Sequence, residues 1–572
     1  MNNCPDRSRA SSVTSLAALL CVTLTACSNE PEPIPDYYGT LEPFARESVY
    51  FIVTDRFVDG DPANNYEDQG GEFGTFDIPI QHPDGGSGNI GYLGGDFRGV
   101  LDNAGYIRDM GFTAVWLTPV VDQPDEAFRG GKTIAESAFP DRGKTGYHGY
   151  WGVNFFVADE HLVSDGLDFG ALTRSLKDDY DLKFVLDVVA NHGSPSFTMP
   201  EDQPKYGEIY GPDGELIADH QNLHPTDLDP DNPLHQFFHR ETDLNELSNI
   251  NDQNPAVLDY FLDSYRYWID QGVDALRIDT IRHMPHEFWK QIADGVREHR
   301  PGMFMFGEHW DNNAAAYAPH TYPENGGVSV LDFAGKERMR AVFGRESAPY
   351  STIASYLHLD DGLYANPYDL MTFYDNHDMP RLDASVDGFR DANNWLFTSR
   401  GIPVVYYGSE VAFRAGTPEH GGNRDYFGQD RVDAAKSHDL RASLARVAGI
   451  RKASPALQRG LQVNLTFSDD TASFYRVYQH DGVYQTALVL LNKGDSPAEM
   501  SVDRWLAPGA WRDADGDDEI VIAGPDDALS ATVAAHDLKV FLLDAPNENP
   551  GLAVELARLQ AGARSRGTAA AP

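Results

Sequence analysis

Cysteine is nearly absent from this chain and is confined to its N-terminal end. Only three of the 572 residues are cysteine, namely Cys4, Cys21 and Cys27. The rest of the chain therefore cannot form a disulfide, although small exported domains often depend on them. Its length allows a large hydrophobic core instead, so stability has to come from core size or from bound metal.

Positive charge is also scarce. The chain holds 45 Lys and Arg against 88 Asp and Glu, a formal net charge of −43. Nucleic acid and anionic membrane surfaces would repel such a protein, so both are excluded as partners. A neutral substrate or cations are favoured.

Long hydrophobic runs are lacking except near the N-terminus. Arg7 and Arg9 precede an apolar run over residues 13–24, which is too short to span a membrane and is typical of an export signal. Leu24-Thr-Ala-Cys27 resembles the lipobox of bacterial lipoproteins, which implies that Cys27 becomes a lipidated first residue. A plain secretory signal is the alternative.

The residues after the cysteine are typical of a tether. Residues 28–43 are rich in proline and acidic side chains. Ser28, rather than an aspartate, favours the outer membrane. We therefore expect an exported outer-membrane lipoprotein, on the periplasmic or cell-surface face, that touches the membrane only through its lipid.

Eight short apolar runs, most of them separated by helical patterns, predict a (β/α)₈ barrel. They cover residues 49–53, 112–117, 184–189, 273–278, 303–306, 328–333, 370–373 and 402–407.

The predicted fold class is α/β, with a TIM barrel as its catalytic domain. The barrel takes residues 44–192 and 251–455, and residues 193–250, which are polar, form a domain inserted after strand 3. Alternating patterns predict a C-terminal antiparallel β-sandwich over residues 456–546. The tail, residues 547–572, is predicted to be disordered because its end is rich in Ala and Gly, although 552–559 could form a short helix.

The strand that ends at Asp279 places an arginine beside an aspartate. Arg277 and Asp279 share one face because strand side chains alternate. A permanent positive charge lowers the pKa of a neighbouring aspartate by about 1–3 units, which suits a nucleophile. This segment alone leaves a structural ion pair equally open.

Three more strand ends carry acids or histidines. They are Asp187-Val-Val-Ala-Asn191-His192, Glu308-His-Trp310 and Tyr374-Asp-Asn-His377-Asp378. The carboxyl ends of barrel strands meet at one mouth, so three carboxylates should face one pocket. Such a set favours cleavage of glycosidic bonds, with one nucleophile, one protonated acid and one helper.

These segments resemble the signature segments of the α-amylase family, glycoside hydrolase family 13, in their usual order. Tyr147-His-Gly-Tyr-Trp151, residues 272–283, Gly307-Glu308 and Asp375-Asn-His-Asp378 also belong to this set. The resemblance covers residues 49–543. Residues 53–65 and His283-Met-Pro are especially similar to cyclodextrin glucanotransferases and their amylase relatives.

The resemblance implies a role for each matching residue. Asp279 is expected to be the nucleophile, Glu308 the general acid/base and Asp378 the transition-state stabiliser of a retaining mechanism. The Asp279 and Glu308 carboxyls should then lie about 5–5.5 Å apart. The expected substrate-binding residues are His148, Tyr150, His192, Arg277, Arg282, His283, Trp310 and His377.

Two calcium sites are also implied. One holds Asn191 and the backbone carbonyl of His283, with Glu246 where the family tends to carry aspartate. The other resembles the N-terminal calcium loop of the glucanotransferases, and its oxygen-only ligands suit Ca²⁺; a simple turn cluster is the alternative. Its expected ligands are Asp59, Asp61, Asn64, Asn65, Gly94 and Asp96.

Two departures from the glucanotransferases favour a hydrolase. Thr242 stands where they carry a central aromatic residue, and no further domain follows the first β-domain. We therefore expect a monomeric α-amylase that cleaves α-1,4-glucans such as starch. A glucanotransferase-like or cyclodextrin-opening transglycosylase is the alternative, and a sugar-binding protein without catalysis is disfavoured because all three carboxylates are present.

Overall fold

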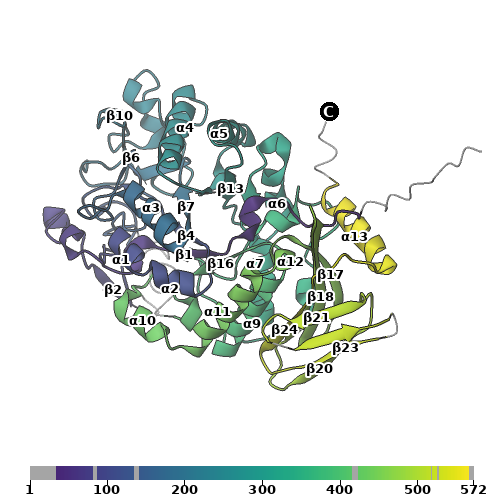
Figure 1. Ribbon diagram of the computed structural model, residues 1–572. Coiled ribbons are helices and arrows are strands. Elements are labelled where there is room, and N and C mark those ends of the chain that lie inside the picture. The colour runs from purple at the N-terminus through teal and green to yellow at the C-terminus, as the bar shows by residue number, and fades with distance from the viewer. Residues whose placement is uncertain are drawn as a thin grey trace, which may run out of the picture. The chain divides into compact units, whose positions relative to one another are not determined.

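Eight parallel strands form the centre of the computed structural model, in the order β14-β13-β12-β7-β4-β1-β16-β15 (Figure 1). A parallel bridge between Leu331 and Met371 joins the two ends of this order, so the sheet closes into a barrel. The predicted TIM barrel is confirmed. The strands are β1 (Val49–Ile52), β4 (Ala114–Leu117), β7 (Lys183–Val188), β12 (Ala275–Ile278), β13 (Phe304–Gly307), β14 (Ser329–Val330), β15 (Met371–Thr372) and β16 (Ile402–Tyr406).

The structure describes residues 34–81, 87–133, 141–414, 423–516, 518–524 and 527–565. The predicted signal segment and the lipidation site at Cys27 lie outside these residues. No helix within the described ranges combines the length and the apolar character needed to cross a membrane.

Barrel strands are covered on both faces, which explains their sequences. Every residue of β1, β4, β12 and β13 is buried. A strand buried on both sides reads as a continuous apolar run rather than as an alternating one. This is why eight short runs were visible in the sequence.

Helices surround the barrel, and α4 shows how they form. Asn254 caps its first turn by accepting from the Ala256 amide, and Pro255 occupies the first position. Gly272 follows its last turn with φ of +111°, which favours glycine. The helices from the barrel are α1 (Phe97–Asp102), α2 (Ala104–Asp109), α3 (Phe169–Tyr180), α4 (Pro255–Asp270), α5 (His286–His299), α6 (Ala314–Tyr317), α7 (Phe333–Phe343), α8 (Ser351–Ala354), α9 (Val386–Thr398), α10 (Gly428–Ala435), α11 (Asp439–Lys452) and α12 (Pro455–Arg459).

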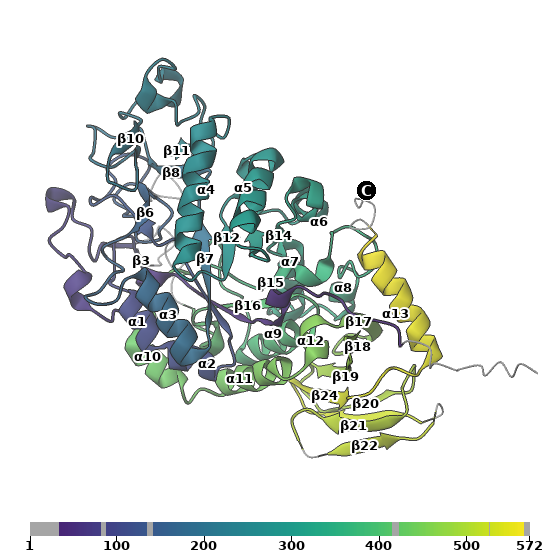
Figure 2. The same cartoon turned by 45° about the horizontal axis from the view of Figure 1, so that its top comes forward.

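The inserted region builds small sheets beside the barrel. One has the order β10-β9-β6-β5 and so joins inserted strands to strands of the barrel loops, while β11 pairs with β8. Figure 2 shows these strands gathered beside α4. The strands of the inserted region and the neighbouring loops are β2 (Pro79–Gln81), β3 (Ser87–Asn89), β5 (Val121–Asp122), β6 (Asn154–Ala158), β8 (His192–Pro195), β9 (Glu208–Tyr210), β10 (Leu216–Asp219) and β11 (Leu247–Asn249).

The C-terminal part is all antiparallel β-structure, as predicted. A six-stranded sheet has the order β17-β18-β19-β24-β21-β22, and β20 pairs with β23 (Figure 2). Trp511 is fully buried in this part. Its strands are β17 (Leu461–Phe467), β18 (Thr471–His480), β19 (Val483–Asn492), β20 (Ala498–Val502), β21 (Gly509–Asp513), β22 (Glu519–Ile522), β23 (Leu529–Val533) and β24 (Asp537–Leu543).

The tail, which was predicted to be disordered apart from a possible short helix over 552–559, contains a longer helix than that. Helix α13 spans Pro550–Ala563 and buries Leu552, Leu556 and Leu559 on one face. The Gln560 side chain accepts from the Tyr38 amide at 2.8 Å, which ties the helix to the start of the described chain. Burial of a leucine face outweighs the low complexity of the Ala/Gly-rich end.

Candidate active site

A cavity of about 470 Å³ is lined by most of the predicted catalytic and substrate-binding residues. It is lined by side chains from barrel strand ends and from the inserted region, so the three acids that lie up to a hundred residues apart in sequence meet here. The predicted residues that line it are His148, Tyr150, Asp279, Arg282, His283, Glu308, Trp310, His377 and Asp378.

Arg277 lies behind this cavity and touches three carboxylates. Its Nη1 donates to Asp279 Oδ1 at 2.7 Å and to Asp187 Oδ1 at 2.8 Å. Its Nη2 lies 3.2 Å from Glu308 Oε2. Arg277 is fully buried, so it orients Asp279 without lining the cavity. One guanidinium thus holds the expected nucleophile and the expected acid together.

Glu308 is poised to act as an acid. Burial raises its pKa to about 8, and repulsion from Asp279 and Asp378 adds to this, against the attraction of Arg277. The Thr280 amide donates to Glu308 Oε2 at 3.3 Å. Glu308 therefore carries a proton at neutral pH, which is the state that can protonate a leaving oxygen.

Asp378 is ionised, in contrast to the protonated Glu308. Burial alone would raise its pKa, but His377, Arg424 and Arg277 outweigh that effect and lower it. Arg424 Nη2 donates to Asp378 Oδ1 at 2.6 Å, and His377 Nε2 lies 3.1 Å from Oδ2. Burial lowers the pKa of His377 to about 3, so its ring is neutral at pH 7.

Aromatic rings form one wall of the cavity. Tyr150 stacks on His377 with ring centres 5.3 Å apart, and its hydroxyl donates to Asp187 Oδ2 at 2.9 Å. The Tyr150 amide donates to His148 Nδ1 at 3.1 Å, and this hydrogen bond holds the His148 ring in place. Flat apolar faces with polar edges suit a sugar ring.

Trp310 lines the same cavity and is expected on the leaving-group side. Its side chain is 44% exposed, and its ring packs on Phe333 at 5.7 Å. Arg282 Nη1 donates to the Trp310 carbonyl at 3.3 Å. An exposed tryptophan at a cavity mouth is available to a ligand.

His192 does not line the cavity, although direct contact with sugar was predicted for it. It is buried next to the site, and its Nδ1 has no hydrogen-bond partner among the described residues. Burial lowers its pKa, so the ring is neutral.

Several residues that line the catalytic cavity were not predicted from the sequence. Arg424 lies in the long loop after β16, where no periodic pattern points to it, yet it binds Asp378. Leu244 and Asn245 lie just before Glu246, the predicted calcium ligand, so the sequence gave their position but no role. The lining residues that were not predicted are Lys144, Trp151, Leu244, Asn245, Leu247, Thr280 and Arg424.

The N-terminal acidic loop fits a cation. The side-chain oxygens Asp59 Oδ1, Asn64 Oδ1 and Asn65 Oδ1 are buried without a hydrogen-bond partner in the described structure. A Cβ on Gly94 would lie 2.4 Å from Asn65 Oδ1 and 2.8 Å from Asp59 Oδ2, so only glycine leaves this space open. Buried oxygens normally have partners, and a hard cation would supply one.

The other two expected ligands of this loop have mainly structural contacts. Asp96 accepts from the amides of Gly60, Asp61 and Gly99 and so caps α1. Asp61 Oδ1 accepts from the Ala63 amide at 3.2 Å. They shape the loop around the three free oxygens.

The structure shows Asp243, and not the expected ligand Glu246, in contact with Asn191 and His283. The Glu246 carboxylate lies against Gly131, where a Cβ would come within 2.0 Å of Oε1, and Asp141 is its charged neighbour. Asp243 instead meets Asn191, whose Nδ2 donates to Oδ2 at 3.1 Å, and His283, whose Nδ1 lies 3.0 Å from Oδ1. The path of the loop after residue 242 decides which carboxylate reaches Asn191.

One further acidic group lies between the barrel and the inserted region. Carboxylate oxygens of Asp122, Asp125 and Glu160 all lie within 4.8 Å of one another. Lys205 Nζ lies 3.0 Å from Asp125 and 3.4 Å from Asp122, so an internal ammonium already supplies positive charge there.

A TIM barrel whose strand ends bring a protonated acid, an arginine-held carboxylate and a third carboxylate into one cavity defines an enzyme that acts on glycosidic bonds. Residues 51–455 match the sequence model of the α-amylase catalytic domain. The chain belongs to the α-amylase family, glycoside hydrolase family 13, whose members act on α-glucans.

Known relatives include both glucanotransferases and amylases. The chain is 30% identical over 509 residues to a cyclomaltodextrin glucanotransferase of Klebsiella oxytoca, which aligns 79% of this chain with 71% of that protein. It is 28% identical over 541 residues to an α-amylase of Niallia circulans, covering 90% and 93% of the two chains.

A similar solved structure is that of a cyclomaltodextrin glucanotransferase described as the first with a three-domain ABC distribution. Its TM-score is 0.70 at 27% identity, with 87% of this chain and 99% of that chain covered.

Proposed function

We propose that this protein hydrolyses α-1,4-glucosidic bonds of starch and maltodextrins with retention of configuration. The observation that carries the proposal is that Arg277 contacts both Asp279 and Glu308. This shared contact keeps a carboxylate and an acid close enough to act on the same glycosidic bond. Two carboxyl groups close together are the arrangement of retaining enzymes. Their separation of about 5–5.5 Å stays a prediction.

The reaction proceeds in two displacements. Asp279 attacks the anomeric carbon while Glu308 gives its proton to the leaving oxygen, which breaks the glycosidic bond and leaves a glycosyl ester on Asp279. A water molecule then attacks the same carbon, Glu308 takes a proton from it, and Asp279 leaves as a carboxylate. Asp378, ionised by Arg424, stabilises the positive charge that develops on the sugar.

Transglycosylation is the second candidate, since a sugar hydroxyl could replace water. Hydrolysis is favoured by the inserted region, whose described residues contribute Leu244, Asn245 and Leu247 to the cavity but no aromatic ring around which a glucan could wrap. Thr242 stands at the position expected for that ring. The number of domains does not separate the two candidates, because a glucanotransferase with a three-domain ABC distribution is known.

Product analysis separates the two candidates. With maltoheptaose as substrate, we expect only linear products shorter than seven glucose units, measured by chromatography with mass detection. Cyclic products, or linear products longer than the substrate, would instead identify a transglycosylase. The Thr242→Tyr variant is the matched comparison, because a ring at this position should shift products towards cyclisation.

We also propose that Ca²⁺ binds the loop around Asp59, Asn64 and Asn65 and stabilises the fold. Support comes from the three buried oxygens without partners and from the space above Gly94. The pair of Asn191 and Asp243, with the carbonyl of His283, is the second candidate position. In both places the ion would hold loops together and would take no part in the reaction.

Removal of calcium is expected to lower the unfolding free energy by about 3 kcal/mol when the ion is otherwise present at about a hundred times its Kd. Denaturation with and without chelator measures this effect. Asp59→Ala should remove the part of the response that comes from this loop, while Asp109→Ala, an exposed aspartate on α2, should keep the whole response. An equal response in both variants would place the ion elsewhere.

Export as an outer-membrane lipoprotein, anchored through Cys27, stays part of the proposal, as does a monomeric state. The apolar run and the Leu24-Thr-Ala-Cys27 ending support it. Mass spectrometry of the membrane-bound protein should find an acylated Cys27 at the N-terminus, and a soluble product cleaved elsewhere would contradict this.

A further inference from the structure

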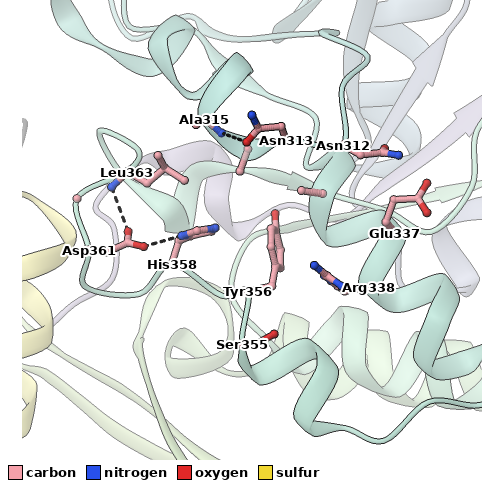
Figure 3. Close-up of a pocket in the computed structure, with 13 residues that line it drawn as sticks. Asn312, Asn313, Ala315, Glu337, Arg338, Ser355, Tyr356, His358, Asp361 and Leu363 are labelled. Atoms are coloured by element: carbon pink, nitrogen blue, oxygen red, sulfur yellow. Dashed lines mark hydrogen bonds and ion pairs between the residues drawn. The ribbon is translucent and has the colours of Figure 1, made fainter.

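A second and larger cavity, of about 820 Å³, lies between α6, the first turns of α7 and residues 355–363. We call it the α6–α7 cavity. Figure 3 shows Asn312 and Asn313 on one side, Glu337 and Arg338 from α7 on another, and Tyr356 and His358 facing them. Its volume is in the range of small-molecule sites.

This cavity adjoins the catalytic cavity near Trp310, where the leaving group is expected. Trp310 lines the catalytic cavity, and Asn312, two residues later, lines the α6–α7 cavity. Their Cα atoms can be no more than about 7 Å apart. The Trp310 ring packs on Phe333, the first residue of α7, and that helix supplies Glu337 and Arg338. A glucan that extends past Trp310 therefore reaches the α6–α7 cavity next.

The cavity wall carries charges of both signs. Arg338 is its cation and Glu337 and Asp361 are its acids, and Asp361 lies 2.6 Å from His358 Nδ1. Two carboxylates beside one guanidinium disfavour a phosphate ligand. Amides, a guanidinium and carboxylates offer both donors and acceptors, which suits the hydroxyl groups of a neutral sugar.

Tyr356 provides an independent sign of a ligand. Its side chain is 7% exposed, and its hydroxyl has no hydrogen-bond partner in the described part of the chain. In Figure 3 the hydroxyl end points towards Asn312 and Asn313. Buried hydroxyls are nearly always satisfied, so an unpaired one at a cavity wall indicates a group that binds there.

We propose that the α6–α7 cavity is an additional glucan-binding site that holds the part of a long α-glucan beyond the leaving-group side of the cleft. The inference rests on the proposed function and narrows its substrate class. Long α-glucans span both cavities, whereas short maltooligosaccharides fill only the first. The enzyme thus binds long chains more tightly through contacts far from the scissile bond.

Kinetics on substrates of two lengths test this. Tyr356→Phe and the double variant Asn312→Ala/Arg338→Ala are expected to raise KM for amylose about five- to tenfold, as expected for the loss of one or two hydrogen bonds. Values of kcat, and both constants for maltotriose, should not change. Tyr356→Phe removes an unpaired hydroxyl only, so its melting temperature should equal that of the parent.

Two exposed residues outside both cavities serve as controls. Tyr267→Phe on α4 and Arg174→Ala on α3 should leave every constant unchanged. An unchanged KM for amylose, or an equal rise for amylose and maltotriose, in the cavity variants would overturn the inference. Failure of the proposed function itself would appear differently, as no turnover of a glucan of any length by the parent.

Discussion

Glu308→Gln is expected to lower kcat on starch by about 10²–10⁴-fold, because the leaving oxygen loses its proton donor. The structure explains why this carboxyl is the donor: burial and two neighbouring carboxylates raise its pKa to about 8. In the parent, kcat/KM should therefore fall as pH rises through about 8, when Glu308 loses its proton. Steady-state kinetics over pH 5–10 measure both effects.

The glutamine variant carries its own control. Glutamine cannot ionise, so the alkaline limb of the pH profile should disappear in Glu308→Gln. An activated aryl glucoside, whose leaving group needs no proton, should be cleaved with a much smaller loss in the first displacement. A starch activity equal to that of the parent, or an alkaline limb that persists, would show that another group supplies the proton.

Arg277→Ala is expected to lower the unfolding free energy by about 3–5 kcal/mol at pH 8, since removal of one partner leaves buried charges uncompensated. Arg277 meets Asp187, Asp279 and Glu308, all of which are buried. Kinetic constants should collapse as well, because the nucleophile loses its orienting contact. Chemical denaturation gives the free energy.

The loss of unfolding free energy in Arg277→Ala should be larger at alkaline pH than at acidic pH. In the folded parent the pKa of Asp187 is raised to about 7, mainly by burial, and that of Glu308 to about 8. An acid with a raised folded pKa binds more protons when folded, so stability falls as pH rises from about 4 towards these values. Without Arg277 the pKa values of Asp187 and Glu308 rise further. The unfolding free energies of the variant and the parent should therefore differ much less at pH 5 than at pH 8.

An exposed arginine gives the matched control for this experiment. Arg174→Ala on the surface of α3 should change the free energy by less than about 0.5 kcal/mol at either pH. Equal losses for Arg277→Ala at pH 5 and pH 8 would show that packing, rather than charge, sets the contribution of Arg277.

The barrel was predictable because its strands are buried on both faces. Residues 184–189 and 402–407 read as isolated apolar runs, and β7 and β16 occupy them. The short strand β6 was not predicted, because it pairs across the boundary between a barrel loop and the inserted region. Helix α13 was anticipated only as a possible short helix over residues 552–559, because burial of its leucine face depends on contacts with distant segments.

The site was predictable where it follows strand ends. Asp279 and Glu308 come directly after apolar runs, so the topology alone brings them to one mouth. Arg424 and Asp243 lie in long loops, whose paths depend on contacts with distant segments. No local pattern could choose Asp243 over Glu246, since both are acidic and only three residues apart.

The sequence by itself determined the strands of the barrel, because a continuous apolar run is a local property, and which chemical groups stand at the ends of those strands. Only the tertiary structure decided the protonation of Glu308, the ionisation of Asp378, the carboxylate that meets Asn191, and the cavity beyond Trp310. These features depend on burial and on charges contributed by segments far apart in the chain. The order of residues does not show which of these segments lie close together in space.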